Sequence, residues 1–352
     1  MSYDDDFLEL EEEFHNQDRK ADRKERKIAQ KRDRSKYKKS NLEKVEVASD
    51  ELQAGEELGR ILQVLPENAA IVELEGEELT CHFKGALRKE KGLNRNILAV
   101  GDLVHVVVGE ELITHIRKRS SELTRADSKN ANKRHVLAAN VDQVLITQSV
   151  TLPKLRPHLL DRYIIACENG NMTPIIILNK IDLLKRGSEE RELFKEIEVL
   201  YSSLGYQVIS VSAERGKNLR ALKKVMKGKV SVFSGQSGVG KTSLINAMTG
   251  FDFETREIML QNQKGTHTTT RSILFPIDGG GYCIDTPGIK SFGMEPIDPA
   301  TIRAYFTEIT RVGEGCRFSS CTHVHEPACA VKAAVAEGKI SSLRYQSYCN
   351  LI

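Results

Sequence analysis

The sequence contains a glycine-rich segment with the spacing of a phosphate-binding loop, G-x-x-x-x-G-K-[ST]. The segment consists of Gly235, Gln236, Ser237, Gly238, Val239, Gly240, Lys241 and Thr242, followed by Ser243. Glycines allow backbone amides to curl around phosphates, and a helix that follows presents the positive end of its dipole. We expect the Lys241 amine to reach the β- and γ-phosphates of a nucleotide and the Thr242 hydroxyl to bind Mg²⁺.

A second segment carries residues suited to recognising a guanine base. It consists of Asn179, Lys180, Ile181 and Asp182. The Asp182 carboxylate can accept hydrogen bonds from N1–H and the 2-amino group of guanine, a pair that adenine lacks. We expect Asn179 to support the base edge and the Lys180 stem to cover the ring. Ser212 and Ala213 follow the next predicted strand, where the Ala213 backbone N–H can meet guanine O6.

In isolation the guanine-reading tetrapeptide is more often a surface loop, but together with a phosphate loop it indicates a GTP site. Its position is unusual, because it precedes the phosphate loop by more than fifty residues. In Ras-like GTPases the phosphate loop comes first and the base-recognition segment last. The rotated order predicts a circularly permuted GTPase.

Two further segments are suited to sensing the γ-phosphate. The first, Asp285-Thr286-Pro287-Gly288, ends a predicted strand. Its Asp285 carboxylate is expected to hold Mg²⁺, through water, and its Gly288 N–H to meet the γ-phosphate. The second, residues 265–270, is rich in threonine. We expect one of these threonines, Thr269, to bind Mg²⁺ and the γ-phosphate in a switch that orders with GTP.

The residue after Gly288 is Ile289, where Ras-type enzymes place the glutamine that orients the attacking water. Intrinsic hydrolysis should therefore be slow, with another group or a partner completing the site. His267 is the nearest candidate in sequence, with a catalytic and a structural role both open. One alternative function is a GTP-dependent RNA-binding switch with negligible hydrolysis. Another is an ATPase or kinase that shares only the phosphate loop.

A group of cysteines and a histidine near the C-terminus has the composition of a metal site. It contains Cys316, Cys321, His323 and Cys329, and His325 is an alternative to His323. Three thiolates and an imidazole suit a closed tetrahedral Zn²⁺ site, which is structural rather than catalytic. Such an ion stabilises a unit too small to have a sufficient apolar core.

The elements that must position the nucleotide segments alternate between strands and helices. Apolar strands are predicted at residues 141–147, 174–178, 208–211, 230–234 and 282–284, with helices at 157–168, 189–204 and 242–248. This alternation is typical of a doubly wound α/β sheet. The phosphate loop and the base-reading segment both follow strands, which is the edge where such sheets bind ligands.

The rest of the chain predicts additional parts around the α/β sheet. Five short strands, at 58–65, 69–74, 79–83, 103–108 and 111–116, indicate a small barrel with an OB-fold. Residues 1–54 are acidic at first and then strongly basic, which favours a disordered segment or solvated helix. This arm is either a solubilising tail or an arm that neutralises nucleic-acid phosphates. Beyond residue 296 the pattern is helical.

We therefore expect a multidomain α/β protein, an OB-fold β-barrel joined to a circularly permuted P-loop GTPase domain and a small α-helical zinc-binding domain. The predicted boundaries are 1–54 for the charged extension, 55–118 for the barrel, 119–138 for a basic linker, 139–295 for the GTPase domain and 296–352 for the zinc domain. No apolar run approaches the ~18 residues of a membrane span, and the acidic start excludes a signal peptide. We expect a cytoplasmic protein with no membrane partner.

The motifs together resemble the RsgA (YjeQ) family of circularly permuted ribosome-assembly GTPases. Two segments add to those above, Ala139-Asn140-Val141-Asp142 and Leu160-Asp161-Arg162-Tyr163. The resemblance covers roughly residues 55 to 350. It leaves out the acidic start of the chain.

The resemblance implies GTP hydrolysis that the small (30S) ribosomal subunit stimulates late in its maturation, with release of other assembly factors. It implies contact with rRNA, which gives the basic arm and linker an RNA-binding role, and we expect a monomer. It favours Cys316, Cys321, His323 and Cys329 as zinc ligands over His325. Because Asp285 is followed so soon by the zinc ligands, we also expect hydrolysis to move the C-terminal domain.

Overall fold

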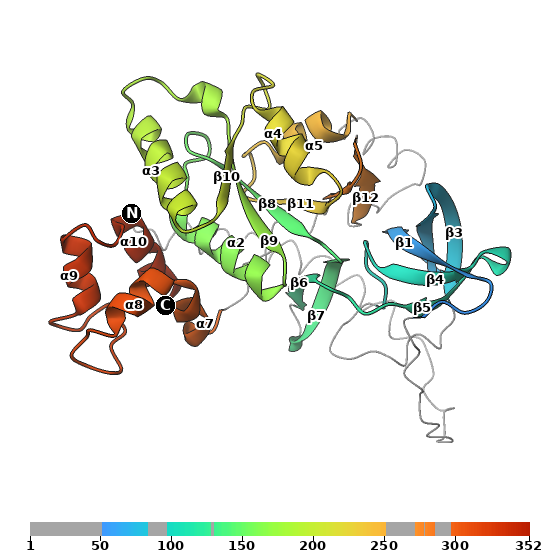
Figure 1. The fold of residues 1–352 in the computed structure, drawn as a ribbon, viewed down its shortest axis with the longest axis horizontal. Coiled ribbons are helices and arrows are strands. Elements are labelled where there is room, and N and C mark those ends of the chain that lie inside the picture. Colours follow the sequence, from blue (N-terminus) through green and yellow to red (C-terminus); the bar gives the residue numbers. More distant parts are fainter. Residues whose placement is uncertain (1–50, 84–96, 128–129, 251–271, 278, 286–296) are drawn as a thin grey trace, which may run out of the picture. The chain divides into compact units, whose positions relative to one another are not determined.

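The computed structural model describes residues 51–83, 97–127, 130–250, 272–277, 279–285 and 297–352. They form a five-stranded barrel, a mainly parallel sheet with helices on both faces, and a C-terminal group of short helices (Figure 1). No helix in these residues is both long and apolar enough to cross a membrane.

The N-terminal strands close into an OB-like barrel. They are β1 (Glu56–Val64), β2 (Ala69–Leu74), β3 (Glu77–Phe83), β4 (Leu103–Val107) and β5 (Leu112–Ile116). Their order is β1-β2-β3-β5-β4, and pairing of β4 with β1 closes the barrel. Only β3 and β5 run parallel within it. Alternate side chains fill the interior, among them Ile61, Val72, Cys81, Val104 and Ile113. The structure confirms the predicted barrel.

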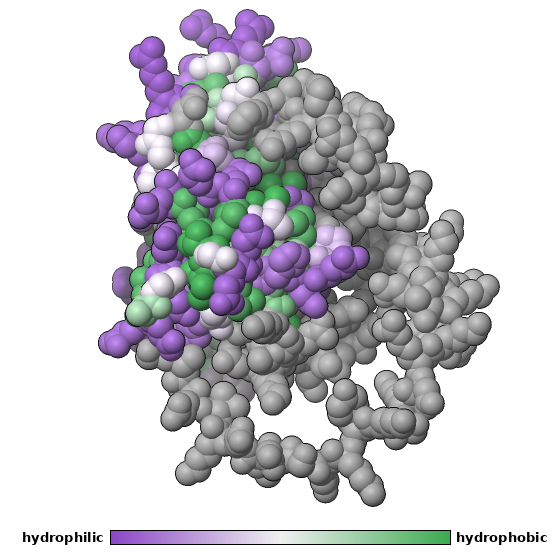
Figure 2. Space-filling model, turned by 90° about the vertical axis from the view of Figure 1, so that its right-hand side faces the viewer, coloured by the Kyte–Doolittle hydropathy of each residue, from purple (hydrophilic) through white to green (hydrophobic). Residues whose placement is uncertain are grey.

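The outer surface of the barrel carries some apolar side chains. Figure 2 faces the side of the molecule on which the barrel lies in Figure 1, and shows apolar residues gathered among hydrophilic ones. Leu58 on β1 is 40% exposed and Val108, which starts the short helix η2 (Val108–Glu110), is 38% exposed.

Much of the segment predicted as a basic linker folds as an antiparallel pair, β6 (Glu122–Asp127) and β7 (Asn130–Ala139). Just before it, the Arg119 guanidinium binds the carboxylate of Asp102, with Nε–Oδ1 and Nη2–Oδ2 distances of 2.7 and 2.9 Å. Asp102 is completely buried. Arg119 Nη1 also donates to Glu122 Oε1 of β6 at 3.1 Å, so Arg119 joins the barrel to the strand pair. Contact of the basic segment with phosphates stays a prediction.

The second sheet contains the strands that the motifs required. They are β8 (Gln143–Ser149), β9 (Thr173–Asn179), β10 (Gln207–Ser210), β11 (Val230–Ser234) and β13 (Tyr282–Asp285). These strands run parallel in the order β10-β9-β8-β11-β13. An antiparallel strand that the sequence pattern did not reveal, β12 (Ile273–Pro276), follows β13. The predicted α/β sheet is confirmed.

Within the described residues, two helices cover each face of this sheet. The first face is covered by α2 (Pro157–Asn169) and α3 (Glu189–Ser203), which bury apolar residues such as Leu160 and Ile197 against it. On the opposite face, α4 (Leu219–Met226) and α5 (Lys241–Thr249) bury residues such as Leu222 and Leu244. The helices thereby exclude water from both faces, as a parallel sheet requires.

The C-terminal helices are short and share one small core. They are α7 (Pro299–Tyr305), α8 (Thr307–Gly313), α9 (Ala330–Ala336) and α10 (Ser342–Leu351). The core contains Ile302, Phe306, Ile309, Val331 and Tyr348, and Ile165 of α2 is part of it. We call these helices and the loops between them the helical unit. Its core reaches α2, a helix beside the mainly parallel sheet, through Ile165.

The barrel and the mainly parallel sheet share hydrogen-bonded strands. β1 pairs antiparallel with β12, with Gln63 opposite Ile273, so the two sheets form one sheet of eleven strands. Beside this pairing the Tyr282 hydroxyl donates to Glu73 Oε2 at 2.5 Å, and the Arg60 guanidinium lies 5.3 Å from the centre of the Tyr282 ring. We call these contacts the barrel junction.

Candidate nucleotide-binding and metal sites

The glycine-rich segment connects β11 to α5, as its sequence required. Gly235 has φ +140°, and a Cβ there would lie 2.1 Å from the carbonyl oxygen of Thr147. Gly240 has φ +92°, and a Cβ there would lie 2.4 Å from Asn179 Nδ2. Backbone and side chains of the neighbouring strands leave no room for another residue at either position. The loop conformation therefore depends on glycine at both ends.

The cationic and hydroxyl groups of the loop lie at the start of α5. Lys241 Nζ donates to the carbonyl oxygens of Gly235 and Gln236, at 2.6 Å each, so the ammonium group lies across the loop. Thr242 and Ser243 occupy the next two positions and are exposed. The Lys241 amine thus contacts the glycine-rich loop and the two hydroxyl residues follow it at the exposed start of α5, while their contacts with a nucleotide stay predictions.

Asn179 joins the base-reading segment to two other loops. It ends β9 and is almost completely buried. Its Nδ2 donates to the carbonyl oxygen of Val239 at 2.9 Å, and its Oδ1 accepts from the Ala213 N–H at 3.1 Å. One amide side chain therefore holds together the phosphate loop, the base-reading segment and the loop after β10.

Lys180 lies across the phosphate loop from the other side. Its backbone is left-handed, with φ +63°, and its Nζ donates to the carbonyl oxygens of Gly238 and Leu152 at 2.6 and 2.7 Å. Leu152 belongs to the loop between β8 and α2 and is largely exposed. Nothing in the sequence indicates the contact of this loop with Lys180, because a backbone carbonyl leaves no signal in residue type or spacing.

Asp182 lies in the short helix η3 (Ile181–Leu183), on the surface of the molecule. The Ser212 hydroxyl donates to Asp182 Oδ1 at 2.5 Å, and the Arg215 N–H donates to the Ser212 oxygen at 3.0 Å. Ser212 is completely buried. A buried hydroxyl thus orients the exposed carboxylate that is expected to read guanine.

The two segments predicted to sense the γ-phosphate lie only partly within the described residues. Asp285 ends β13, which runs parallel to β11 with Val232 opposite Ile284, so its backbone ends near the start of the phosphate loop. The Asp285 side chain and the residues His267, Thr269, Gly288 and Ile289 lie outside the described part of the chain. Their roles stay predictions.

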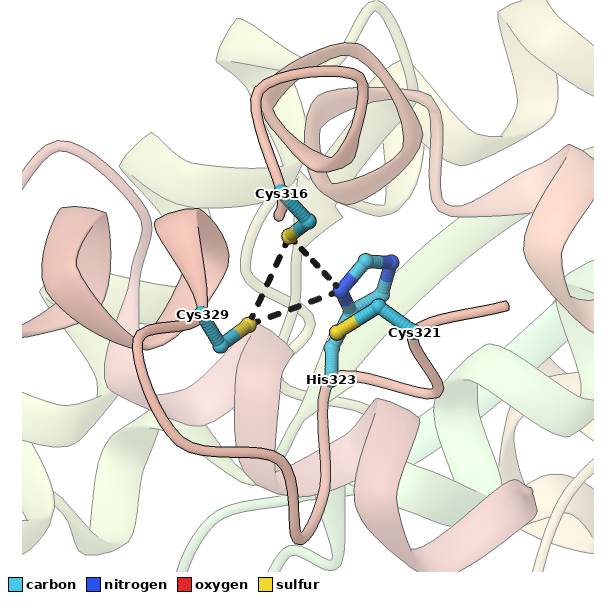
Figure 3. A group of neighbouring side chains, drawn as sticks. All are labelled: Cys316, Cys321, His323 and Cys329. Carbon is cyan, nitrogen blue, oxygen red and sulfur yellow. Dashed lines mark hydrogen bonds between the residues drawn. The ribbon is translucent and has the colours of Figure 1, made fainter. Parts of the chain in front are cut away.

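The predicted metal ligands come together in the helical unit (Figure 3). The ligand atoms of Cys316, Cys321, His323 and Cys329 all lie within 4.8 Å of one another. Cys316 Sγ and Cys329 Sγ are 3.7 Å apart, and each lies 3.5 Å from His323 Nδ1. Tetrahedral Zn²⁺ with usual bond lengths separates two sulfurs by about 3.8 Å and a sulfur and nitrogen by about 3.5 Å. Three of the four ligand atoms, those of Cys316, Cys329 and His323, therefore have the separations that a tetrahedral zinc ion requires.

Hydrogen bonds hold the loop that presents His323. The Tyr345 hydroxyl donates to the His323 carbonyl oxygen at 2.8 Å, and the N–H and hydroxyl of Thr322 both donate to Glu326 Oε1 at 2.8 Å. These two donors lower the pKa of Glu326 to about 2. A Cβ on Gly313 would lie 2.8 Å from the His323 ring. The imidazole is thus held from several sides.

The environment of His323 also favours its ligand form. Burial, and then the charge of Arg303, lower the pKa of His323 below its ordinary value, so the imidazole stays neutral. A neutral imidazole is the form that binds metals. His325 is not a member of the cluster. The geometry agrees with His323 rather than His325 as the fourth ligand.

The segment Leu160-Asp161-Arg162-Tyr163 has a role that its sequence did not disclose. Arg344 of α10 binds the Asp161 carboxylate of α2, and its Nε donates to Glu308 Oε1 at 2.6 Å. The Tyr201 hydroxyl donates to Asp161 Oδ1 at 2.9 Å. Asp161 and Arg344 are both buried. We call this group the helical junction, since it joins α2 to the helical unit.

Comparison with known proteins agrees with this arrangement. The RsgA GTPase family matches residues 116–295 of the chain. The small ribosomal subunit biogenesis GTPase RsgA 2 of Bacteroides thetaiotaomicron is 38% identical over 282 residues, which cover 79% of this chain and 90% of that protein. The RsgA protein of Chlorobaculum parvum, with the same functional name, is 39% identical over 269 residues, covering 73% of this chain and 85% of its own.

Solved structures are similar as well. YjeQ from Thermotoga maritima has a TM-score of 0.64 and 31% identity, covering 84% of this chain and 96% of its own. YloQ, described as a circularly permuted GTPase, has a TM-score of 0.62 and 28% identity, and the match covers 86% of this chain and 96% of the YloQ chain.

Proposed function

The chain belongs to the RsgA family of GTPases, and from that premise we propose how its residues serve the maturation of the small ribosomal subunit. The protein is a GTPase, and its sheet carries the base-reading strand before the phosphate-loop strand in sequence, as in a circular permutation. Its relatives are named for biogenesis of the small subunit, and this protein acts in the same process.

The observation that carries a GTP-specific site is the bridge made by Asn179. Its side chain bonds both to the phosphate loop, at Val239, and to Ala213. Three segments far apart in sequence are thereby fixed as one surface, with Asp182 and Lys180 beside it. A nucleotide bound to the phosphate loop would place its base against these groups. Guanine satisfies the Asp182 carboxylate, whereas adenine leaves it unpaired.

We assign the remaining contacts by their chemistry. Lys241 and the loop amides bind the β- and γ-phosphates, and the Thr242 hydroxyl and Asp285 carboxylate hold Mg²⁺, which neutralises charge on the phosphates. Gln236, Ser237, Ile181, Ser243, Thr269 and Gly288 complete the set of nucleotide contacts. His267 is the proposed catalytic residue, because Ile289 cannot orient the attacking water.

The partners follow from the same premise. We propose that the small subunit, through its rRNA, binds the protein and stimulates its slow hydrolysis, which helps to release other assembly factors. The protein would act as a monomer in the cytoplasm, where its substrate is found. One Zn²⁺ on Cys316, Cys321, His323 and Cys329 would have a structural role. We also propose the division predicted from the sequence, in which a barrel, a GTPase domain and a zinc domain are accompanied by a charged extension and a linker segment.

The test is release of phosphate from GTP with and without small subunits. We expect subunits to accelerate release by the wild type and His267→Ala to lose that acceleration while still binding GTP. Acceleration that persists in His267→Ala would remove this residue from catalysis. Absence of acceleration in the wild type would contradict the proposed role of the subunit.

A matched variant tests the base specificity separately. Asp182→Asn should lose affinity for GTP and gain affinity for xanthosine triphosphate. The reason is that an amide can donate to the 2-oxo group that xanthine carries in place of the amino group of guanine. Hydrolysis of xanthosine triphosphate should then be stimulated by subunits as before. An unchanged preference for GTP would show that Asp182 does not read the base.

A further inference from the structure

The turn between two of the metal ligands exposes an aromatic ring. Phe318 is 44% exposed, and it is the one aromatic residue among the exposed large hydrophobic side chains of the described residues. The other such residues are aliphatic: Leu52, Leu58, Val108, Leu152, Leu183, Val199 and Ile352. Exposure of a phenyl ring forgoes the stabilisation that burial would give. A single exposed apolar side chain is common on protein surfaces, so the groups around Phe318 decide what this ring can bind.

The ring is held in place by its neighbours in sequence. Cys316 and Cys321, both in the metal cluster, lie on either side of this turn, and the Cys321 N–H donates to the Phe318 carbonyl oxygen at 3.1 Å. The guanidinium carbon of Arg317 lies 5.6 Å from the centre of the Phe318 ring. Arg317 is itself exposed. A planar cation and an aromatic ring are thus presented together on a short turn that is fixed at both ends.

A cavity opens beside the ring. It has a volume of about 270 Å³, and its polar lining includes Arg303, Thr310, Glu314 and Ser319. Three of the metal ligands, Cys316, Cys321 and His323, also line it. This volume is just below the roughly 300–1,000 Å³ of sites for drug-sized ligands, so it suits one planar ring system. Within the described residues, Arg303 Nε is buried and has no hydrogen-bond partner. The walls offer both donors and acceptors to a ligand edge.

We propose that the turn 316–321 and this cavity form a binding site for one unpaired base of RNA. The base stacks on Phe318 and Arg317, and its edge meets the polar groups of the cavity wall. Proteins that bind unpaired RNA stack bases on aromatic rings and guanidinium planes in this way. A docking site for the apolar surface of another protein would instead need a contiguous exposed apolar patch of several hundred Å². The proposal rests on the proposed function, because the small subunit supplies the RNA.

Binding assays on the full-length, metal-loaded protein test the site. The ligands are small ribosomal subunits, a short single-stranded RNA and the same RNA as a duplex. Phe318→Ala should weaken binding to the subunit and to the single strand about tenfold, because stacking on one aromatic ring contributes that order of affinity. Duplex binding should not change. Val199→Ala, which removes another exposed apolar side chain, on α3, should have no effect on any of the three.

Two more variants separate stacking from structure and from charge. Phe318→Tyr should bind as the wild type and Phe318→Leu as Phe318→Ala, since leucine keeps apolar volume but cannot stack. Arg317→Gln should reduce the dependence of binding on salt, because it removes a positive charge beside the bound RNA, whereas Phe318→Ala should leave that dependence unchanged. Zinc content and intrinsic GTP hydrolysis should be the same in all variants.

Several outcomes would overturn the proposal. Wild-type affinity in Phe318→Ala or Phe318→Leu would exclude stacking, and so would an equal loss for single strand and duplex. A loss of subunit binding without a loss of single-strand binding would assign the turn to a ribosomal protein. Failure of the wild type to bind subunits would contradict the proposed function, while the single-strand comparison would still decide the role of Phe318.

Discussion

The GTPase sheet is joined to its two neighbours by contacts of opposite kinds. The barrel junction consists of backbone pairing between β1 and β12, with one phenol–carboxylate bond and one cation–ring contact beside it. The helical junction consists of side chains alone, a buried Asp161–Arg344 ion pair that also engages Glu308 and Tyr201. The first extends a sheet, whereas the second depends on charges removed from water.

The two junctions also meet different parts of the nucleotide site. In sequence, β12 follows the segment that contains Thr269, and β13 leads into the segment that contains Gly288. Both segments are predicted to sense the γ-phosphate. The barrel is therefore bonded to the strands next to them. The helical unit is held by α2, which begins after the Leu152 loop that contacts Lys180. Order of the chain predicts that hydrolysis moves the helical unit. Because β1 of the barrel pairs with β12, we expect hydrolysis to move the barrel as well.

The largest expected effect is that of metal removal, which should separate the two junctions. A structural zinc site contributes as much as about 10 kcal/mol to a small unit. Chelation should abolish amide protection in residues 299–351 and leave the amides of β1 and β12 protected, because the barrel junction contains no metal ligand. Hydrogen exchange with and without chelator measures both. Equal loss of protection at the two junctions would show that they unfold as one.

Arg344→Met should be the most damaging single substitution at either junction. It leaves the buried Asp161 carboxylate without its cation, which typically costs about 3–5 kcal/mol. Denaturant unfolding measures the change. The double variant Asp161→Leu/Arg344→Met should recover much of the loss, because no uncompensated charge then remains on α2. A loss below about 1 kcal/mol for Arg344→Met would mean that the pair is not buried.

Tyr282→Phe should have a smaller effect at the barrel junction. It removes one hydrogen bond from a partly buried pair, which corresponds to about 1 kcal/mol. The strand pairing of β1 with β12 remains, so the barrel should stay attached. Denaturant unfolding gives the energy, and exchange of the β12 amides shows whether the pairing persists. Loss of β12 protection would show that the phenol, rather than the backbone, holds this junction.

The smallest expected effect is a dependence of the barrel junction on high pH. Burial, and then the neighbouring Glu73 carboxylate, raise the pKa of Tyr282 to about 12. A tyrosine in an unfolded chain titrates near 10, so the bond stabilises the fold fully below that pH and is lost as the pH rises through about 12. Wild-type stability should therefore fall more than that of Tyr282→Phe over this interval. If the stability of the wild type and that of Tyr282→Phe fall equally with pH, the Tyr282 hydroxyl and the Glu73 carboxylate do not interact.

Patterns within short segments were enough to predict most elements and the four residues of the metal cluster. The predicted strands of the barrel and the helices 157–168 and 189–204 agree with the structure to within one or two residues at most ends. Strand and helix periods are local properties, and the glycines of the phosphate loop are needed for local backbone reasons. The same holds for the metal ligands, because cysteine and histidine have few other uses at such a spacing.

The sequence by itself determined the kind of chemistry, which is guanine recognition, phosphate binding and metal binding. Only the tertiary structure decided which groups outside the motifs complete them. The Leu152 carbonyl on Lys180, the Arg119–Asp102 pair, Arg344 on Asp161 and the pairing of β12 with β1 all join residues remote in the chain. A carbonyl is the same in every residue, and the partner of a charge depends on which surfaces meet when the chain folds. Contacts between residues remote in the chain produce no periodic pattern and no fixed spacing in the sequence, so the sequence cannot predict them.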